Sequence, residues 1–207
     1  MEKIDLLLWD DDAATAATAL EPAEVPGLRS AQVSLAAELP GATLLMGDGA
    51  ALRGMAELWV DSVDIWPDVV RRVPGDAYLV TESVPQPVAP GDWLTHFTWF
   101  PKPERLTEEE FFHGWHVVHT PSSARLHPLR QGYVRDAVAR TLTPGSPPVR
   151  AIVSEYFAED VYLDPGRLFG PPESLERTMA ELPLYADQAD ISSRPLRRTA
   201  AAPAVLG

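Results

Sequence analysis

The chain has 207 residues, a formal charge of −13 and no cysteine, and 45% of its residues are hydrophobic. A mean hydropathy of −0.10 and the absence of a long apolar run are typical of a globular protein that does not span a membrane. The composition excludes disulfides, thiolate nucleophiles and thiolate-bound metals, and without a Lys/Arg patch we expect no nucleic-acid partner. The N-terminal residues lack a signal-peptide pattern, so we expect a cytoplasmic protein.

Short apolar and alternating runs predict the elements of the first half of the chain. Strands are expected at residues 4–9, 28–36, 56–60 and 77–84, and helices at 12–20 and 65–72. Prolines and glycines separate these runs, and their densest group near the middle of the chain, at 85–91, lies between two predicted strands. We therefore place a boundary there and predict two units, 1–88 and 89–207.

The second unit is longer and contains a clear helix start. Strands are expected at 93–100, 132–142, 150–157 and 195–201, with a second helix at 172–182. Thr107 and Glu110 form a capping-box pattern that predicts the beginning of the first helix. That helix is expected to reach His119 and to end at Pro121, because proline interrupts helical hydrogen bonding.

Short segments of the two units resemble each other in the same order along the chain. Residues 56–63 (AELWVDSV) align with 154–161 (SEYFAEDV), 28–33 with 129–134, and 7–9 with 98–100. The pattern predicts a duplicated strand-helix-strand-strand-helix-strand unit, the ferredoxin-like βαββαβ plan. Glu57 and Glu155 occupy matching positions, which favours a structural role for Glu155, paired with Arg150 or Arg130.

One motif in the second unit resembles a known family. Phe112-x-x-Trp115-x-x-x-His119-x-Pro121, preceded by Leu106-Thr107-x-Glu109-Glu110 and followed by Gly132-Tyr133-Val134, is similar to EthD-type members of the dimeric α+β barrel superfamily. The resemblance implies an α+β fold in which two ferredoxin-like βαββαβ repeats pack face to face as a pseudo-dimeric barrel within one chain. It also implies a ligand cavity between the sheet and the helices of one unit.

All five histidines lie between His96 and His127, within the second unit. On a regular helix, Phe112, Trp115, His116 and His119 fall at positions i, i+3, i+4 and i+7 and share one face. The equivalent helix of the first unit, near 13–17, has no acid, base or aromatic ring. We therefore expect the second repeat to hold the active site and the first, degenerate repeat to support it.

The candidate residues divide into catalytic and substrate-binding groups. The catalytic candidates are His119, Tyr133, His116 and His96. The substrate-binding candidates are Trp115, Phe112 and Asp136. Asp136 is the weaker of these, because three residues along a strand it faces away from Tyr133 unless a bulge intervenes. His113 and His127 are interpreted as bystanders, His127 as a loop residue beside Pro128.

The same residues leave several functions open. A cofactor-independent lyase of the cyclase or dehydratase type, acting by acid–base chemistry on a hydrophobic aromatic or polyketide-like molecule, is our main expectation. Alternatives are a cofactor-free monooxygenase that forms a quinone and a non-catalytic metabolite-binding protein. No cofactor is expected, and no metal, because the rings of His113, His116 and His119 fan around a regular helix. We expect a monomer, as an internal pseudo-dimer, or a homodimer.

Overall fold

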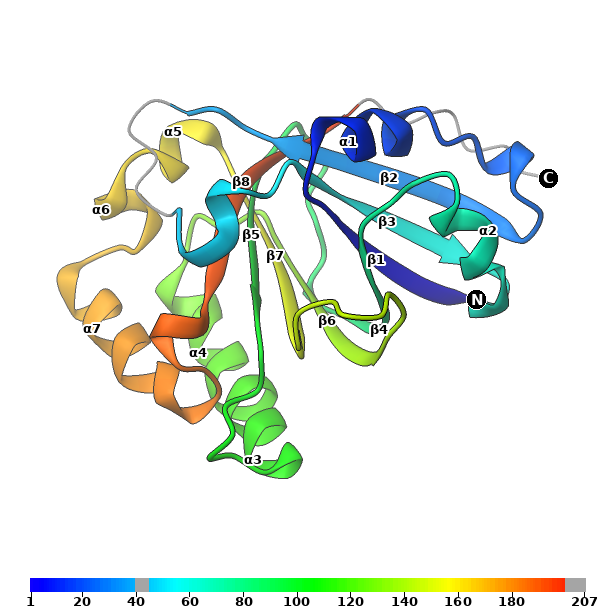
Figure 1. The fold of residues 1–207 in the computed structure, drawn as a ribbon. Helices are drawn as coiled ribbons and strands as arrows, with labels where there is room; N and C mark the ends of the chain where they lie inside the picture. Colours follow the sequence, from blue (N-terminus) through cyan, green and yellow to red (C-terminus); the bar gives the residue numbers. More distant parts are fainter. Residues whose placement is uncertain (40–44, 200–207) are drawn as a thin grey trace.

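The computed structural model describes residues 1–39 and 45–199 (Figure 1). The first half of the chain forms β1 (Glu2–Leu8), α1 (Asp11–Thr18), β2 (Leu28–Ala36), β3 (Gly54–Val60), α2 (Trp66–Val70) and β4 (Asp76–Gln86). Short 3₁₀ turns lie at Pro22–Glu24, Gly47–Ala50 and Val63–Ile65. Each strand and helix predicted for this half is present, with ends that shift by a few residues.

The second half contains more helix than the first. It forms β5 (Leu94–Phe100), α3 (Glu108–Phe112), a π-helix (His113–His119), α4 (Thr120–Leu126), β6 (Gly132–Thr141), β7 (Ala151–Phe157), α5 (Glu159–Tyr162), α6 (Pro165–Leu168), α7 (Pro172–Glu181) and β8 (Ser192–Arg198). Further 3₁₀ turns lie at Leu182–Leu184 and Gln188–Asp190. The last strand begins at Ser192 rather than Pro195, and positions 200–201 of its predicted range lie outside the described residues.

The strands form one closed antiparallel barrel in the order β1-β3-β2-β8-β5-β7-β6-β4, with β4 paired to β1. The predicted fold of two ferredoxin-like βαββαβ repeats packed face to face as a pseudo-dimeric α+β barrel is therefore wrong. Hydrogen bonds between β2 and β8 and between β4 and β6 join the strands of the two halves into a single sheet. Pairing these edge strands gives hydrogen-bond partners to backbone N–H and C=O groups that would lack them at the edges of two separate sheets.

Side chains alternate between the inside and the outside of this barrel. Leu7, Phe97 and Ile152 belong to a core cluster that draws residues from strands all round the barrel and fills its interior. Ile4 and Leu6, on the opposite face of β1, pack in a second cluster with residues of α1 and α2. The inner face of β1 also carries Lys3 and Asp5, so one part of the barrel interior is charged.

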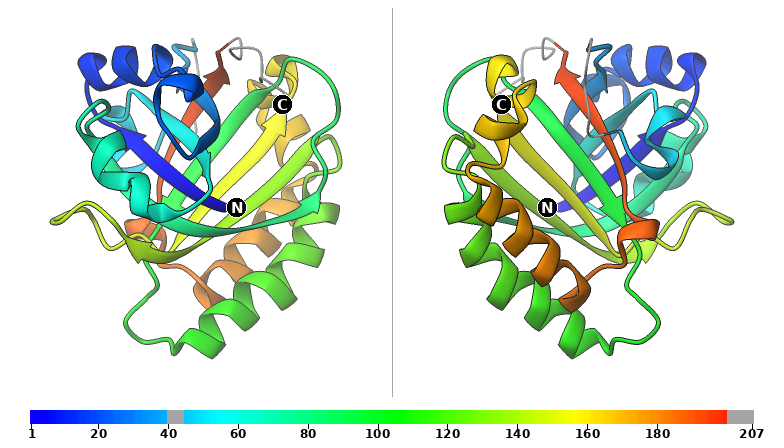
Figure 2. Two further views of the ribbon diagram at one scale, coloured as in Figure 1. Left: turned by 90° about the vertical axis from the view of Figure 1, so that its right-hand side faces the viewer. Right: turned by 90° about the vertical axis from the view of Figure 1, so that its left-hand side faces the viewer.

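The helices cover two separate parts of the outer surface. α1 and α2 lie beside β1–β3, whereas α3 to α7 lie over the strands of the second half (Figures 1 and 2). In the right-hand view of Figure 2, α4 and α7 run side by side across β5, β6 and β7. A third core cluster, which includes Phe100, Phe111, Trp115 and Tyr185, fills the space between these strands and helices.

The helical run after Thr107 begins as predicted but ends differently. Thr107 and Glu110 form the expected capping box. The run does not stop at Pro121, because the π-helix precedes that residue and α4 carries the chain on to Leu126. Proline lacks an N–H and its ring crowds the carbonyl four residues earlier. The wider π turn, in which the Thr120 N–H bonds to the Trp115 carbonyl, lies directly before it.

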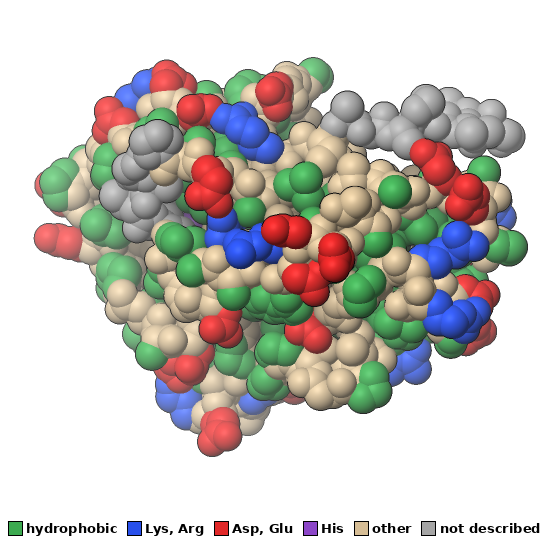
Figure 3. All heavy atoms as spheres, turned by 45° about the horizontal axis from the view of Figure 1, so that its top comes forward, with side chains coloured by type: hydrophobic (Ala, Val, Ile, Leu, Met, Phe, Trp, Pro, Cys, Tyr) green, Lys and Arg blue, Asp and Glu red, His purple; other side chains and the backbone are tan. Residues whose placement is uncertain are grey.

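Acidic and basic side chains are interspersed over the described surface visible in Figure 3, without an extended basic patch on that face. The expectation of no nucleic-acid partner stays a prediction. Among residues 1–39 and 45–199, no helix is long and apolar enough to cross a membrane.

Candidate functional site

A cavity of about 260 Å³ lies between the outer face of the second-half strands and the helices that cover it. Its walls are largely aromatic and aliphatic, and include Phe100, Trp115, Phe157, Leu182 and Tyr185. The polar side chains that line it include His96, His119, His127, Tyr133 and Glu155. A mostly apolar cavity with a few convergent polar groups is the usual form of a small-molecule site.

His119, at the end of the π-helix, is held by a carboxylate on α7. Its Nδ1 lies 3.3 Å from Oε2 of Glu181, whose Oε1 accepts a hydrogen bond of 2.7 Å from the Ser122 hydroxyl. Because an ionised carboxylate only accepts, this contact places the imidazole proton on Nδ1 and leaves Nε2 as an acceptor. The ring also packs on Tyr185, with centroids 4.6 Å apart.

Burial keeps the imidazole of His119 uncharged at neutral pH. Burial lowers its pKa from the ordinary value, while Glu155, and the hydrogen bond and charge of Glu181, act in the opposite direction. The neutral ring is therefore the resting form, and two nearby carboxylates stabilise the imidazolium that proton transfer would create.

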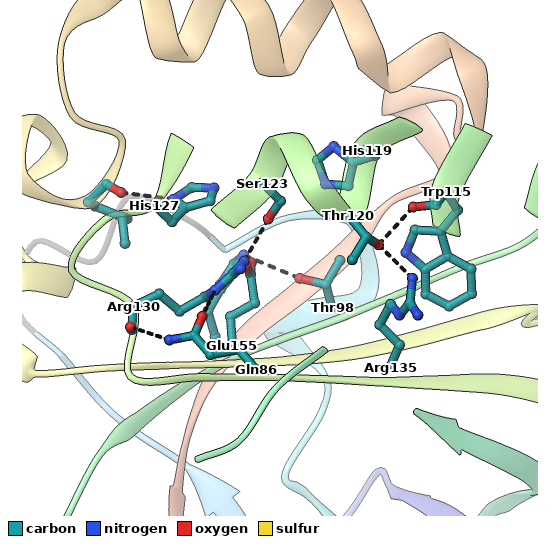
Figure 4. Close-up of polar contacts among 12 residues, drawn as sticks. Gln86, Thr98, Trp115, His119, Thr120, Ser123, His127, Arg130, Arg135 and Glu155 are labelled. Atoms are coloured by element: carbon teal, nitrogen blue, oxygen red, sulfur yellow. Dashed lines mark hydrogen bonds and ion pairs between the residues drawn. The ribbon is translucent and has the colours of Figure 1, made fainter. Parts of the chain in front are cut away.

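The floor of the cavity is a polar row across three strands. His96 on β5, Glu155 on β7 and Tyr133 on β6 are paired in register, so their side chains stand next to one another. Arg130, from the loop before β6, bonds Oε1 of Glu155 and donates to Ser123 Oγ at 2.6 Å (Figure 4). Its guanidinium carbon lies 4.2 Å from the centre of the Tyr133 ring. The expected pairing of Glu155 with Arg130 is confirmed.

This row has a fixed charge pattern at neutral pH. Burial opposes ionisation of Glu155, but His127, Arg130 and His96 outweigh it and lower the pKa of its carboxyl to about 2. Burial and the Glu155 charge raise the pKa of Tyr133 to about 12. The floor therefore presents an ion pair and a protonated phenol, which can donate a hydrogen bond.

The other two histidines of the cavity differ in their hydrogen-bond partners. His96 has both ring nitrogens engaged, Nδ1 with Tyr162 Oη at 3.3 Å and Nε2 with Thr98 Oγ1 at 3.2 Å, and burial lowers its pKa to about 4. His127 bonds through Nδ1 only among the described residues, donating to the Leu168 carbonyl at 2.9 Å. His127 was interpreted as a loop bystander. It reaches the cavity because α4 continues past Pro121.

The π-helix separates the residues that a regular helix would align. Trp115 and His119, four positions apart, both line the cavity, whereas Phe112 and His116 lie beside it. His116 packs on Trp115, with centroids 4.5 Å apart; burial lowers its pKa to about 4, and Arg135 adds to the effect. Phe112 lies under the Arg150 guanidinium. The wider turn of a π-helix explains the difference.

Asp136 faces the barrel interior, away from the cavity. Within the described part of the chain, the one group of three acids and histidines whose ligand atoms lie within 4.8 Å of one another is Asp5, Glu57 and Asp136. The Lys3 ammonium lies among them, 2.8 Å from Glu57 and 2.9 Å from Asp136. Lys3 therefore supplies the positive charge at this cluster.

Two functional candidates escaped the sequence interpretation. Glu181 lies in a predicted helix but 62 positions from His119, and no local pattern connects them. His127 carries no motif of its own. By contrast, four of the residues singled out in the sequence, His96, Trp115, His119 and Tyr133, all line one cavity.

No protein-family model matches the chain, and no curated protein matches its sequence. Its fold is similar to solved structures. An anthrone oxidase-like protein aligns with a TM-score of 0.64 and 13% identity over 99% of this chain and 93% of its own. Candidate monooxygenases from Lactobacillus acidophilus and Fusobacterium nucleatum align with TM-scores of 0.52 and 0.50, at 10% and 6% identity, over 97% of this chain and 95% and 92% of theirs. At these identities the likeness shows the fold alone.

Proposed function

We propose that this protein is a cofactor-free oxygenase that converts an anthrone-like aromatic ketone into a quinone. The observation that carries the proposal is His119, whose Nδ1 is held by Glu181 and whose Nε2 is left to accept a proton in a cavity with aromatic walls. The likeness in fold to an anthrone oxidase-like protein and to candidate monooxygenases favours oxygen chemistry over the lyase expected from the sequence.

His119 and Tyr133 have complementary parts in the reaction. Nε2 of His119 takes a proton from the ring CH₂ opposite the substrate carbonyl, and the carbonyl oxygen becomes an enolate that accepts a hydrogen bond from Tyr133. The carbanion gives one electron to dioxygen, and the two radicals combine to form a C–O bond. The imidazolium returns its proton to the peroxide, and loss of water leaves a carbonyl. The sum is CH₂ + O₂ → C=O + H₂O.

Anthrone is a direct test substrate, since oxygen uptake and the absorbance of anthraquinone can both be followed. With chelator-treated protein and no added flavin, we expect one O₂ consumed for each anthraquinone formed. His119→Gln should lower kcat by about 10²- to 10⁴-fold, and Tyr133→Phe by about 10²-fold. His113→Gln is the matched control, because His113 is exposed on the same π-helix and should keep the wild-type rate.

Two outcomes would contradict this function. Conversion that proceeds equally well without oxygen would indicate a lyase, and tight binding of the ketone without any product would indicate a binding protein. Unchanged turnover in His119→Gln would reject His119 as the base.

A further inference from the structure

Helix α7 forms the outer wall of the cavity. None of its residues is buried, yet Leu175, Thr178 and Met179, at positions i, i+3 and i+4, all line the cavity. Leu175 and Met179 are 43% and 39% exposed, so they also border solvent. A wall with this little buried surface opens at low cost compared with the barrel beneath it.

One residue of α7 also binds His119, the proposed base. Glu181 is the last residue of α7, and its two carboxylate oxygens bind His119 on the π-helix and Ser122 on α4. Within the described chain, these are the side-chain hydrogen bonds that join α7 to the rest of the molecule. The contact that holds α7 in place is therefore also the contact that orients His119.

The two ends of α7 differ: the chain can turn freely before the helix and is anchored after it. Before it, Gly170 has φ +70°, a conformation that favours glycine, and Pro171 follows. After it, the chain passes into the 3₁₀ turn Leu182–Leu184, where Leu182 is again buried. α7 thus lies between a hinge at Gly170, whose backbone is in the left-handed region, and a turn anchored by Leu182. This arrangement lets the helix move as a unit about its ends.

We propose that Glu181 is a positioning residue that couples closure of α7 over the cavity to the orientation of His119. This proposal rests on the proposed function. When α7 lifts, a ligand can enter and His119 loses the partner that keeps the proton on Nδ1. When α7 closes, Glu181 restores that tautomer, and Nε2 faces the enclosed ligand. The base is then complete only when α7 covers the ligand.

Two measurements on the free protein test this coupling without any substrate. Nitrogen-15 NMR reports which ring nitrogen of His119 carries the proton, and hydrogen exchange reports opening of residues 172–184. In wild type we expect Nδ1–H, and amide exchange in these residues that is faster than in the barrel strands but still measurably protected. In Glu181→Ala we expect a mixture of tautomers and exchange about tenfold faster, from loss of charge-assisted hydrogen bonds. Glu181→Gln keeps the side-chain shape and serves if the alanine variant does not fold; we expect a smaller change of the same kind.

Two control variants separate positioning from simple loss of structure. Ser122→Ala removes the second bond to Glu181 and should speed exchange in α7 while leaving the His119 tautomer unchanged. Glu176→Gln, exposed on the same helix, should change neither. An unchanged tautomer, or unchanged exchange, in both Glu181 variants would overturn the coupling. If anthrone is not oxidised, the proposed function fails alone, because these readouts need no turnover.

Discussion

At the scale of single residues, the Arg130–Glu155 pair does more than line the cavity. Arg130 is 3% exposed and Glu155 retains 14% side-chain exposure, so breaking the pair leaves a nearly buried guanidinium. We expect Glu155→Gln to lower the free energy of unfolding by about 2–4 kcal/mol at neutral pH, below the value for a fully buried pair. Urea denaturation measures this, and Glu159→Gln at the exposed Arg197 pair is the control, with a loss under about 1 kcal/mol.

The same pair predicts a pH dependence. The pKa of Glu155 is lowered in the folded state, so its stabilisation is present above the unfolded pKa and is lost as the pH falls towards about 2. Wild type and Glu155→Gln should therefore converge in stability only as the pH falls to about 2. A gap that stays constant from neutral pH to that value would show that the loss comes from packing rather than from charge.

The sequence allowed several residues that line the cavity to be predicted, but not the hydrogen bonds that hold them in place. His119, Trp115 and Tyr133 could be singled out because a helix motif and a neighbouring strand carry them. Glu181 could not, since its contact with His119 depends on how a distant helix lies across the barrel. Hydrogen-bond partners far apart in sequence leave no spacing to detect.

At the scale of elements, the π-helix packs closely against the backbone of the 3₁₀ turn Leu182–Leu184 at one residue, Gly114. Gly114 is buried, and a Cβ added there would overlap the Leu184 carbonyl. Alanine gains about 1 kcal/mol in helix propensity, but the overlap should outweigh this gain. We expect Gly114→Ala to destabilise the protein by about 1–3 kcal/mol in urea unfolding. Val117→Ala, at a 61% exposed position of the same π-helix, should change it by under about 0.5 kcal/mol. A stabilised Gly114→Ala variant would contradict the close packing.

The elements themselves could mostly be predicted, whereas the pitch of this helix could not. Apolar periodicity locates a helix but assumes about 100° per residue. That assumption placed Phe112 and His116 beside Trp115 and His119 on one face. With the π turn, Trp115 and His119 line the cavity while Phe112 and His116 do not, and the chain continues in a helix through Pro121. Nothing in a periodicity pattern distinguishes the two pitches over seven residues.

At the scale of the whole molecule, the strands could be predicted but their closure could not. Alternation shows that a strand has two faces, and it does not show which edges pair. The β2–β8 and β4–β6 pairs that close the barrel join residues from opposite halves of the chain. The division into units 1–88 and 89–207 stays a prediction. Closure also encloses the charged side chains of β1, β3 and β6 in the barrel interior.

That enclosed cluster predicts how stability depends on pH. Asp5 is fully buried, neither of its oxygens has a hydrogen-bond partner, and its nearest cation, the Lys3 ammonium, is 3.7 Å away. Burial and the neighbouring Asp136 raise the pKa of Asp5 well above its ordinary value, and burial raises that of Asp136 to about 6. A raised pKa means that the folded state holds the proton more tightly. The stability that Asp5 and Asp136 contribute is therefore fully present below the pKa of an aspartate in the unfolded chain. It is lost as the pH rises through the higher pKa of each group in the folded protein.

The side chain of Asn resembles a protonated Asp. Asp5→Asn therefore removes the part of the loss of stability at high pH that comes from Asp5. We expect the variant to be more stable than wild type by about 1–3 kcal/mol near pH 8, a rise in Tm of about 2–4 °C per kcal/mol, and to match wild type near about pH 4. Thermal unfolding across this range measures the difference. Asp92→Asn, at an exposed acid, should shift Tm equally at both ends of the range. If Asp5→Asn is instead less stable near pH 8, the Asp5 carboxylate is ionised and stabilised by Lys3, and the barrel interior tolerates the full charge of the cluster.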